Sequence, residues 1–228
     1  METGFDLLLI SAVLFVVSHL GLASPLLRPW LMRRLGERVY SGLYSLLALG
    51  LVVWLAVAYG HAPQEPIWAG EAMRWLPLVA MPFALILLVT GVSGPNPSAK
   101  GQEGLLRAAP DGRGILRVTR HPVLLATGLW ALAHLLAKGD AASLVFFGAF
   151  VVVVALGIPA QERRKRAALG TEWTKFAEAT SVVPFAAILA GRNRFQPGEI
   201  GWGRLAVALA LYAALLAVHP WVFGARPY

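Results

Sequence analysis

The stretch AASLVFFGAFVVVVALGIPAQ, residues 141–161, decides the fold, because it runs for 21 residues without a charged side chain. Its apolar residues do not alternate with polar ones, as they would along an outer-membrane β-strand of about ten residues. A bilayer core about 30 Å thick needs roughly 20 apolar residues of helix. The stretch therefore predicts a transmembrane helix.

Further uncharged runs of similar length lie on both sides of this stretch. They cover residues 7–27, 39–64, 75–99, 121–137 and 205–225. Hydrophobic residues make up 57% of the chain and charged residues 14%, whereas a soluble domain carries roughly 25% charged residues. The mean hydropathy of +0.64 agrees. We expect an all-α polytopic membrane bundle of about six transmembrane helices, built as a single domain over residues 1–228, and exclude a soluble enzyme, a disordered chain and a coiled coil.

Basic residues cluster in alternate loops between these runs. Of the 20 Lys and Arg residues, four lie in 28–38, five in 100–120 and eight in 163–204. The positive-inside rule then predicts a cytoplasmic location for all three segments, with both termini on the outer side. We therefore interpret the formal net charge of +8 as topology, with the lipid bilayer and not nucleic acid as the partner. The run Gln161–Arg166 is expected to anchor the chain near anionic lipid.

The first apolar run is expected to be retained, because the residues before it lack the positively charged start of a signal peptide. The Ala-, Leu-, Arg- and Gly-rich composition without a transit sequence indicates the cytoplasmic (inner) membrane of a bacterium. The 13-residue uncharged stretch 179–191 is too short to span, so we expect it to lie at the interface or to re-enter.

Histidines are the candidate site residues, because ionisable side chains inside a span are costly and usually face a partner or a cavity. The four within predicted spans are His19, His121, His134 and His219. A hydrogen bond to a neighbouring carbonyl or a role in proton relay would also explain each of them. In a chain without cysteine and with few acids in its spans, however, neutral imidazoles are the best available metal ligands.

Helix geometry restricts which histidines can cooperate. Pro122 predicts a helix start at about His121, since proline suits the first helical position. His134 follows 13 residues later, about 220° around the helix, so these two point to different faces. His19 and His134 are expected roughly 13 and 18 Å from the cytoplasmic side, which brings them to a similar depth. His219 is expected to cap the outer end of the last span beside an aromatic neighbour.

Two imidazoles on different helices at mid-depth suit a flat cofactor that brings its own equatorial ligands. Haem b is such a group, with histidine on one or both axial sides of its iron. A haem-free proton relay stays open as the other explanation of a buried histidine pair.

The chain resembles the NnrU family of polytopic membrane proteins along most of its length. The matching pieces are Ser18–Gly21, Gly36–Tyr40, Leu43–Leu46, Arg120–Pro122, Ala133–His134, Ile158–Lys165 and Ser181–Phe185. The best-understood relative of the family that the chain resembles is the plant 15-cis-zeta-carotene isomerase. It is a membrane haem b enzyme that is active with reduced iron. Bacterial members are associated with denitrification and nitric oxide metabolism.

This resemblance implies a haem b protein that acts on a lipophilic small molecule. It implies His19 and His134 as iron ligands, with His121 and Arg120 as further cofactor-binding residues. It implies either isomerisation of a polyene double bond, by electronic contact with ferrous iron, or support of denitrification chemistry. The chain departs from the isomerase in having no cysteine, so no thiolate can replace a histidine on the iron.

The second half of the chain is also similar to isoprenylcysteine and phospholipid methyltransferases. Arg120–Pro122, Glu162, Leu169–Trp173 and Val183–Pro184 carry this likeness. It implies S-adenosylmethionine bound at the membrane surface by Glu162 and Arg120–Pro122. A haem-free membrane accessory factor is the third hypothesis.

Overall fold

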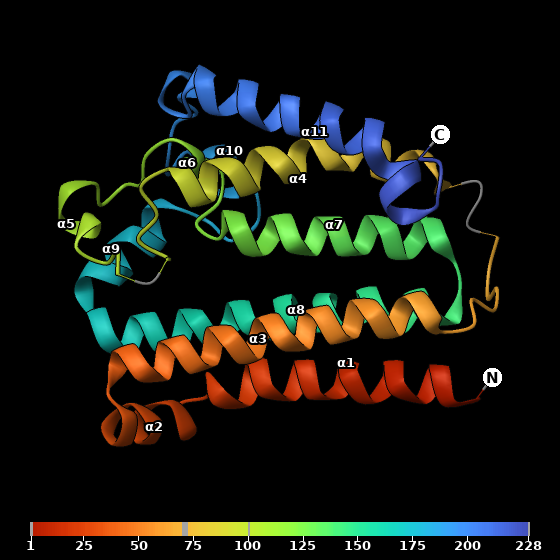
Figure 1. The fold of residues 1–228 in the computed structure, drawn as a ribbon. Coiled ribbons are helices and arrows are strands. Elements are labelled where there is room, and N and C mark those ends of the chain that lie inside the picture. The colour runs from red at the N-terminus through yellow and green to blue at the C-terminus, as the bar shows by residue number, and fades with distance from the viewer. Residues whose placement is uncertain (1, 70–72, 100, 228) are drawn as a thin grey trace. The chain divides into compact units, whose positions relative to one another are not determined.

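Every element assigned among the described residues is a helix (Figure 1). The computed structural model covers residues 1–228 and describes residues 2–69, 73–99 and 101–227. Five helices are long and apolar enough to cross a membrane, and another apolar helix is shorter. The long ones are α1 (Glu2–Leu22), α3 (Glu37–His61), α4 (Trp75–Ser93), α8 (Ala141–Leu169) and α11 (Trp202–Phe223), and the shorter one is α7 (Pro122–Lys138). The all-α, multi-pass prediction is confirmed, and α7 starts where Pro122 predicts.

The remaining helices are short and lie in the three basic segments. They are α2 (Leu27–Leu35), α5 (Leu105–Ala108), α6 (Ile115–Val118), α9 (Thr171–Ala179), α10 (Ala186–Leu189) and the 3₁₀ helix η2 (Pro197–Glu199). The stretch 179–191 holds only the four-residue α10, so it forms no spanning helix, as predicted. Lys100, counted among the basic residues, lies outside the described residues.

The long helices expose apolar side chains that water would not tolerate in such numbers. In α3, Leu46, Leu49 and Val53 are 68%, 61% and 54% exposed. Soluble monomers rarely show large continuous apolar surfaces, whereas hydrocarbon solvates them. The chain is therefore a multi-pass membrane protein whose long helices face lipid.

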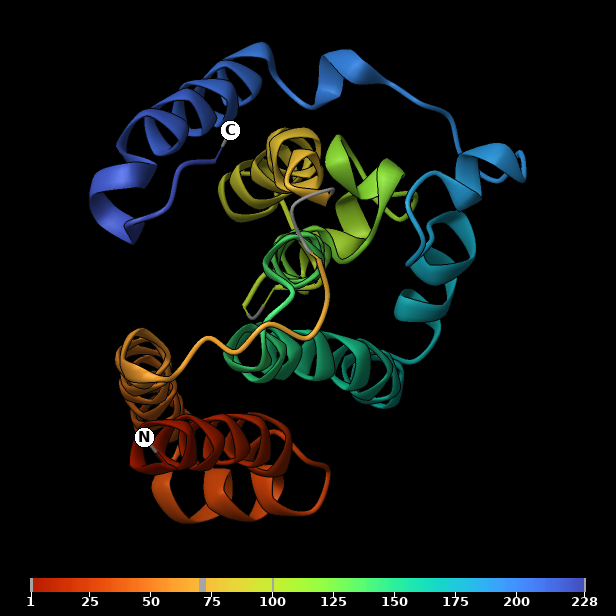
Figure 2. The same cartoon turned by 90° about the vertical axis from the view of Figure 1, so that its right-hand side faces the viewer.

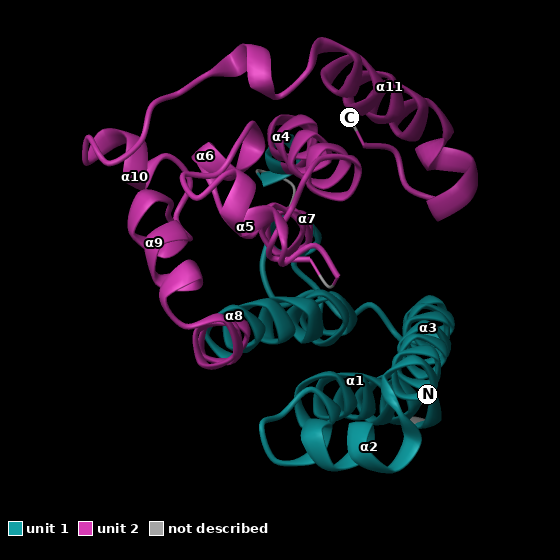
Figure 3. Ribbon diagram, turned by 90° about the vertical axis from the view of Figure 1, so that its left-hand side faces the viewer, with its two compact units in different colours: residues 1–76, 131–160 teal, residues 77–130, 161–228 magenta. Residues whose placement is uncertain are grey.

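The chain divides into two compact units (Figure 3). Unit 1 consists of residues 1–76 and 131–160, and unit 2 of residues 77–130 and 161–228. Both α7 and α8 contribute residues to each unit. Whether the chain forms a single domain stays a prediction.

In unit 1, α1 and α3 lie side by side (Figure 2). Tyr40 of α3 donates a hydrogen bond from its hydroxyl to the carbonyl of Leu22 at 2.9 Å. At the other end of the pair, a Cβ on Gly4 would lie 2.9 Å from the carbonyl oxygen of His61. The glycine therefore allows the two backbones to approach closely, as small residues do between membrane helices.

In unit 2, α4 packs against the start of α7 and is linked to α11. A Cβ on Gly91 of α4 would lie 2.9 Å from Cγ of Pro122, and the Tyr212 hydroxyl of α11 donates to the Leu78 carbonyl at 3.0 Å. A small buried core joins the short helices; it is formed by Leu106, Leu116, Trp173 and Phe176. These contacts fix the loops between the spans against one another.

Candidate cofactor-binding site

His19 lies in the last turn of α1 and is held by its own helix. Its Nδ1 lies 3.1 Å from the Phe15 carbonyl oxygen, and its ring centroid is 4.3 Å from that of Phe15 and 5.8 Å from that of Tyr44. A carbonyl oxygen only accepts, so Nδ1 carries the proton and donates it. The lone pair of a neutral imidazole is then on Nε2, which is how metal-ligating histidines are usually oriented.

His134 lies on α7, within the part of that helix that belongs to unit 1. Its ring stacks on Phe147 of α8, with centroids 5.4 Å apart and an angle of 28° between the planes. Its side chain is partly buried. Stacking on a ring that is itself buried restricts the orientation of the imidazole.

Four phenylalanines connect the surroundings of the two histidines. Phe15 contacts Phe150 at 4.9 Å, Phe150 contacts Phe146 at 5.5 Å, and Phe146 contacts Phe147 at 4.9 Å between ring centroids. We call these four residues the aromatic cluster. The ring of His19 contacts Phe15, and the ring of His134 contacts Phe147. Within unit 1, both histidines therefore border the same aromatic cluster. Their role as iron ligands stays a prediction.

His121 and Arg120 belong to a different place, in unit 2. His121 is 2% exposed, and its Nε2 lies 2.5 Å from Oε1 of Glu162. Arg120 donates from Nε to the same oxygen at 2.7 Å and from Nη2 to Oε2 at 3.2 Å. Among the described residues, no group of three or more His, Asp or Glu side chains is arranged to hold a metal ion. We call Arg120, His121 and Glu162 the polar clamp.

Neighbouring backbone holds the polar clamp in position. Arg120 also donates from Nη1 to the Thr180 carbonyl at 3.2 Å, and its backbone N–H donates to the Ser181 carbonyl at 2.9 Å. Ser98 donates from its hydroxyl to the Arg120 carbonyl at 2.6 Å. The clamp thus joins the loop before α7 and the segment after α9 to the last turns of α8.

The sequence did not predict the burial of the Lys165 side chain. It was expected in an interfacial anchor, yet it is 7% exposed and donates to the Pro97 carbonyl at 3.0 Å and to Oε1 of Glu103 at 2.7 Å. Glu162 and Lys165 lie three residues apart, on one face of a helix. An acidic residue three positions before a lysine, within the otherwise basic run Gln161–Arg166, is the feature of the sequence that could have indicated an inward-facing side of this helix.

His219 caps the end of the last span, as predicted. Its Nδ1 lies 2.8 Å from the Ala225 carbonyl oxygen, and its ring centroid is 4.8 Å from that of Phe223. The aromatic neighbour that the imidazole contacts is Phe223. Both contacts are local, so they give no indication of a ligand.

The apolar helices define a multi-pass membrane protein. Its candidate site lies on these helices, where His19 and His134 contact the aromatic cluster. The family described as NnrU protein matches residues 7–227, so the chain belongs to the NnrU family.

Two curated relatives are plant enzymes. The chain is 28% identical over 202 residues to the chloroplastic 15-cis-zeta-carotene isomerase of Zea mays, and 27% identical over 201 residues to that of Arabidopsis thaliana. Each match covers 82% of this chain and 51% of the relative, so the chain spans about half the length of these enzymes. No solved structure matches the chain.

Proposed function

We propose that this protein binds haem b between its membrane helices and converts a cis double bond of a lipophilic polyene to trans. The observation that carries the proposal is the position of His19 and His134 on one aromatic cluster, with Nε2 of His19 left as the ligand atom. The distant similarity to 15-cis-zeta-carotene isomerases supports the substrate class.

Histidine, the ligand type that unit 1 offers, is one that haem b takes. The porphyrin supplies four equatorial nitrogens, so the protein needs to add only one or two axial ligands. His19 and His134 are imidazoles within one unit, and aromatic rings such as those of the cluster pack well against a flat conjugated ring. The chain has no cysteine, so histidine is the strongest ligand type that it offers.

The residues of unit 1 have distinct roles in this proposal. His19 binds through Nε2, while its Nδ1–H bond to the Phe15 carbonyl fixes the tautomer and the orientation of the ring. Phe147 orients His134 by stacking, and the other rings of the cluster exclude water from the site. Bound haem would supply a redox-active iron that exchanges charge with a conjugated chain and lowers the order of its cis double bond.

An optical spectrum of the purified protein tests the cofactor. We expect a Soret band that shifts on reduction with dithionite. Isomerisation of 15-cis-zeta-carotene under reducing conditions, with loss of the activity on oxidation, tests the reaction. A haem-loaded protein that leaves the polyene unchanged would favour denitrification or nitric oxide chemistry at the same histidines. Colourless protein after expression with ample haem would overturn the proposal.

Three substitutions test the ligands. His19→Ala and His134→Ala should lose most of the haem or convert a low-spin spectrum to a high-spin one, because no thiol can substitute. His121→Ala should retain the haem, since His121 is bonded to Glu162. His61→Ala is the matched control, because His61 is exposed in the last turn of α3. If His121→Ala empties the protein and His134→Ala does not, the site belongs to unit 2.

The methyltransferase hypothesis receives less support from the polar clamp. Both carboxylate oxygens of Glu162 already accept hydrogen bonds, and the Arg120 guanidinium is engaged by Glu162 and backbone carbonyls. These bonds already use much of the capacity with which the two groups would bind S-adenosylmethionine. Protection of colourless protein against heating by S-adenosylmethionine would revive this hypothesis, and colourless protein without such protection would favour an accessory factor.

We propose the bacterial cytoplasmic membrane as the location, with both termini on the outer side. Contacts within unit 2 support the orientation, because Arg117 and Glu199, from two different basic segments, form an ion pair at 2.8 Å. Two of the three basic segments thus share one side, as the positive-inside rule requires.

A further inference from the structure

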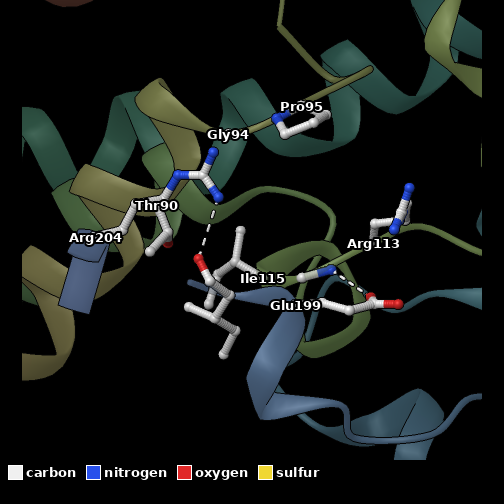
Figure 4. Close-up of a pocket in the computed structure, with 9 residues that line it drawn as sticks. Thr90, Gly94, Pro95, Arg113, Ile115, Glu199 and Arg204 are labelled. Atoms are coloured by element: carbon white, nitrogen blue, oxygen red, sulfur yellow. Dashed lines mark hydrogen bonds between the residues drawn. The ribbon is translucent and has the colours of Figure 1, made fainter. Parts of the chain in front are cut away.

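Unit 2 contains a cavity of about 200 Å³ that the proposed haem chemistry does not use (Figure 4). Thr90 and Gly94 line it from the end of α4, Arg113 and Ile115 from the loop and helix around α6, and Arg204 from the start of α11. Its volume is several times the ~30 Å³ that one water occupies in the liquid. The cavity can therefore hold a small polar group.

The position of the cavity indicates what can reach it. It lies where α4 ends at Ser93 and α11 begins at Trp202, and both helices are candidate spans. Ends of spanning helices lie where hydrocarbon gives way to lipid headgroups. Trp202 is 74% exposed there, and tryptophan favours that interface. The group nearest to the cavity in a membrane is thus a phospholipid headgroup.

The charges of the lining favour an anion. Figure 4 shows Arg113 and Arg204 on different sides of the cavity. Arg204 donates to the Ile200 carbonyl at 3.2 Å and to the Ser93 carbonyl at 3.3 Å, which leaves further N–H donors of its guanidinium. Among the residues that the structure describes, the guanidinium of Arg113 donates no hydrogen bond.

Glu199 is the acidic residue of the lining, and its charge is compensated. Oε2 accepts from the Gly114 N–H at 2.9 Å and from Nε of Arg117 at 2.8 Å, and Oε1 accepts from Nη2 of Arg117 at 3.3 Å. The two lining arginines therefore keep a net positive charge. Guanidinium groups suit phosphate because they can donate two parallel hydrogen bonds.

We propose that this cavity binds the phosphate of an anionic phospholipid headgroup, with Arg113 as its principal donor. Basic pockets between membrane helices bind lipid phosphates in this way. The site is independent of the proposed haem site, since it uses none of the histidines or the aromatic cluster.

Native mass spectrometry of the full-length protein in detergent tests the proposal, with dioleoylphosphatidylglycerol as the probe. We expect Arg113→Gln to weaken its binding about tenfold, the effect of losing a charged hydrogen bond. Its melting temperature should change little, because Arg113 acts on Glu199 only through a Coulombic attraction that is weaker than the hydrogen bond from Arg117. Arg194→Gln is the matched control: it removes one positive charge from an exposed side chain outside the cavity and should change binding less than about twofold.

The other outcomes overturn the proposal. Equal losses in both variants would mean that only overall charge attracts the lipid, and no loss in Arg113→Gln would mean that the cavity is not the site. Displacement of the lipid by millimolar inorganic phosphate at constant ionic strength would show a site filled from solution, and the lipid assignment would be wrong.

Discussion

Glu162 accepts hydrogen bonds from two successive residues of a distant segment, Arg120 and His121. Its side chain is 15% exposed, that of Arg120 12% and that of His121 1%. Charges so little hydrated are tolerable only when paired and fully hydrogen-bonded. The polar clamp is therefore best understood as a structural device that closes the loops of unit 2 over the end of α8.

We predict that Glu162→Gln lowers the stability of the protein in detergent by about 2 to 4 kcal/mol, because Arg120 loses its charge partner while it stays buried. The melting temperature measured in detergent should fall accordingly. The haem spectrum of the folded variant should be unchanged if the iron is bound by His19 and His134.

Glu172→Gln is the control for this substitution. Glu172 pairs with Arg107 at 2.7 Å, but their side chains are 37% and 80% exposed. Exposed pairs contribute less than about 1 kcal/mol, so the melting temperature should barely change. Similar effects of the two substitutions would contradict a special role for the clamp.

At the scale of elements, α6 and η2 are joined by one ion pair between side chains that are 14% and 20% exposed, Arg117 and Glu199. The hydrogen bond from Arg117 holds the pKa of Glu199 below its usual value against the opposing effect of burial, and the Gly114 N–H lowers this pKa further. A carboxyl with a lowered pKa stabilises the fold when ionised. This contribution is complete above the unfolded-state pKa of about 4.3 and disappears as the pH falls through the folded-state value.

We therefore predict that Glu199→Gln destabilises the protein at neutral pH and that its difference from the wild type shrinks below about pH 4.3. Melting temperatures of both proteins at pH 7 and at pH 3.5 to 4 would measure this. A difference that stays constant across the range would exclude the ionised pair as its source.

Packing between α4 and α7 depends on the small size of Gly91. A Cβ there would lie 2.9 to 3.1 Å from atoms of Pro122 and Val123. We expect Gly91→Ala to cost about 1 to 3 kcal/mol, the usual effect of overpacking. Gly50→Ala in α3 is the control, because no atom beyond the neighbouring backbone of its own helix lies within 4 Å of the added carbon. Equal stability of the two variants would mean that the contact is readily relieved.

For the whole molecule, orientation in the membrane is the testable property. A reporter that is active only in the cytoplasm should be active when fused after Arg113 or Lys165 and silent when fused at Pro66, because the basic segments are retained inside. Activity at Pro66 would overturn the proposed topology.

Apolar runs and helix starts could be predicted because they depend on local sequence. Pro122 at the first position of α7 is an example, and the cap at His219 is another. The inward turn of Lys165 could not be predicted in this way, because its partners lie 62 to 68 residues earlier in the chain. The aromatic cluster escaped prediction for a similar reason, since Phe15 meets Phe150 only in the folded chain.

The burial of Lys165 gives the folded protein a chemical signature. Its amino group donates to three oxygens and is largely withdrawn from solvent, whereas Lys138 and Lys175 are exposed. Acylating reagents attack only an accessible, unprotonated amine, so they should modify the two exposed lysines and spare Lys165 until the loops of unit 2 open. The reactivity of this one amine would therefore follow the opening of the membrane-surface loops without any added label.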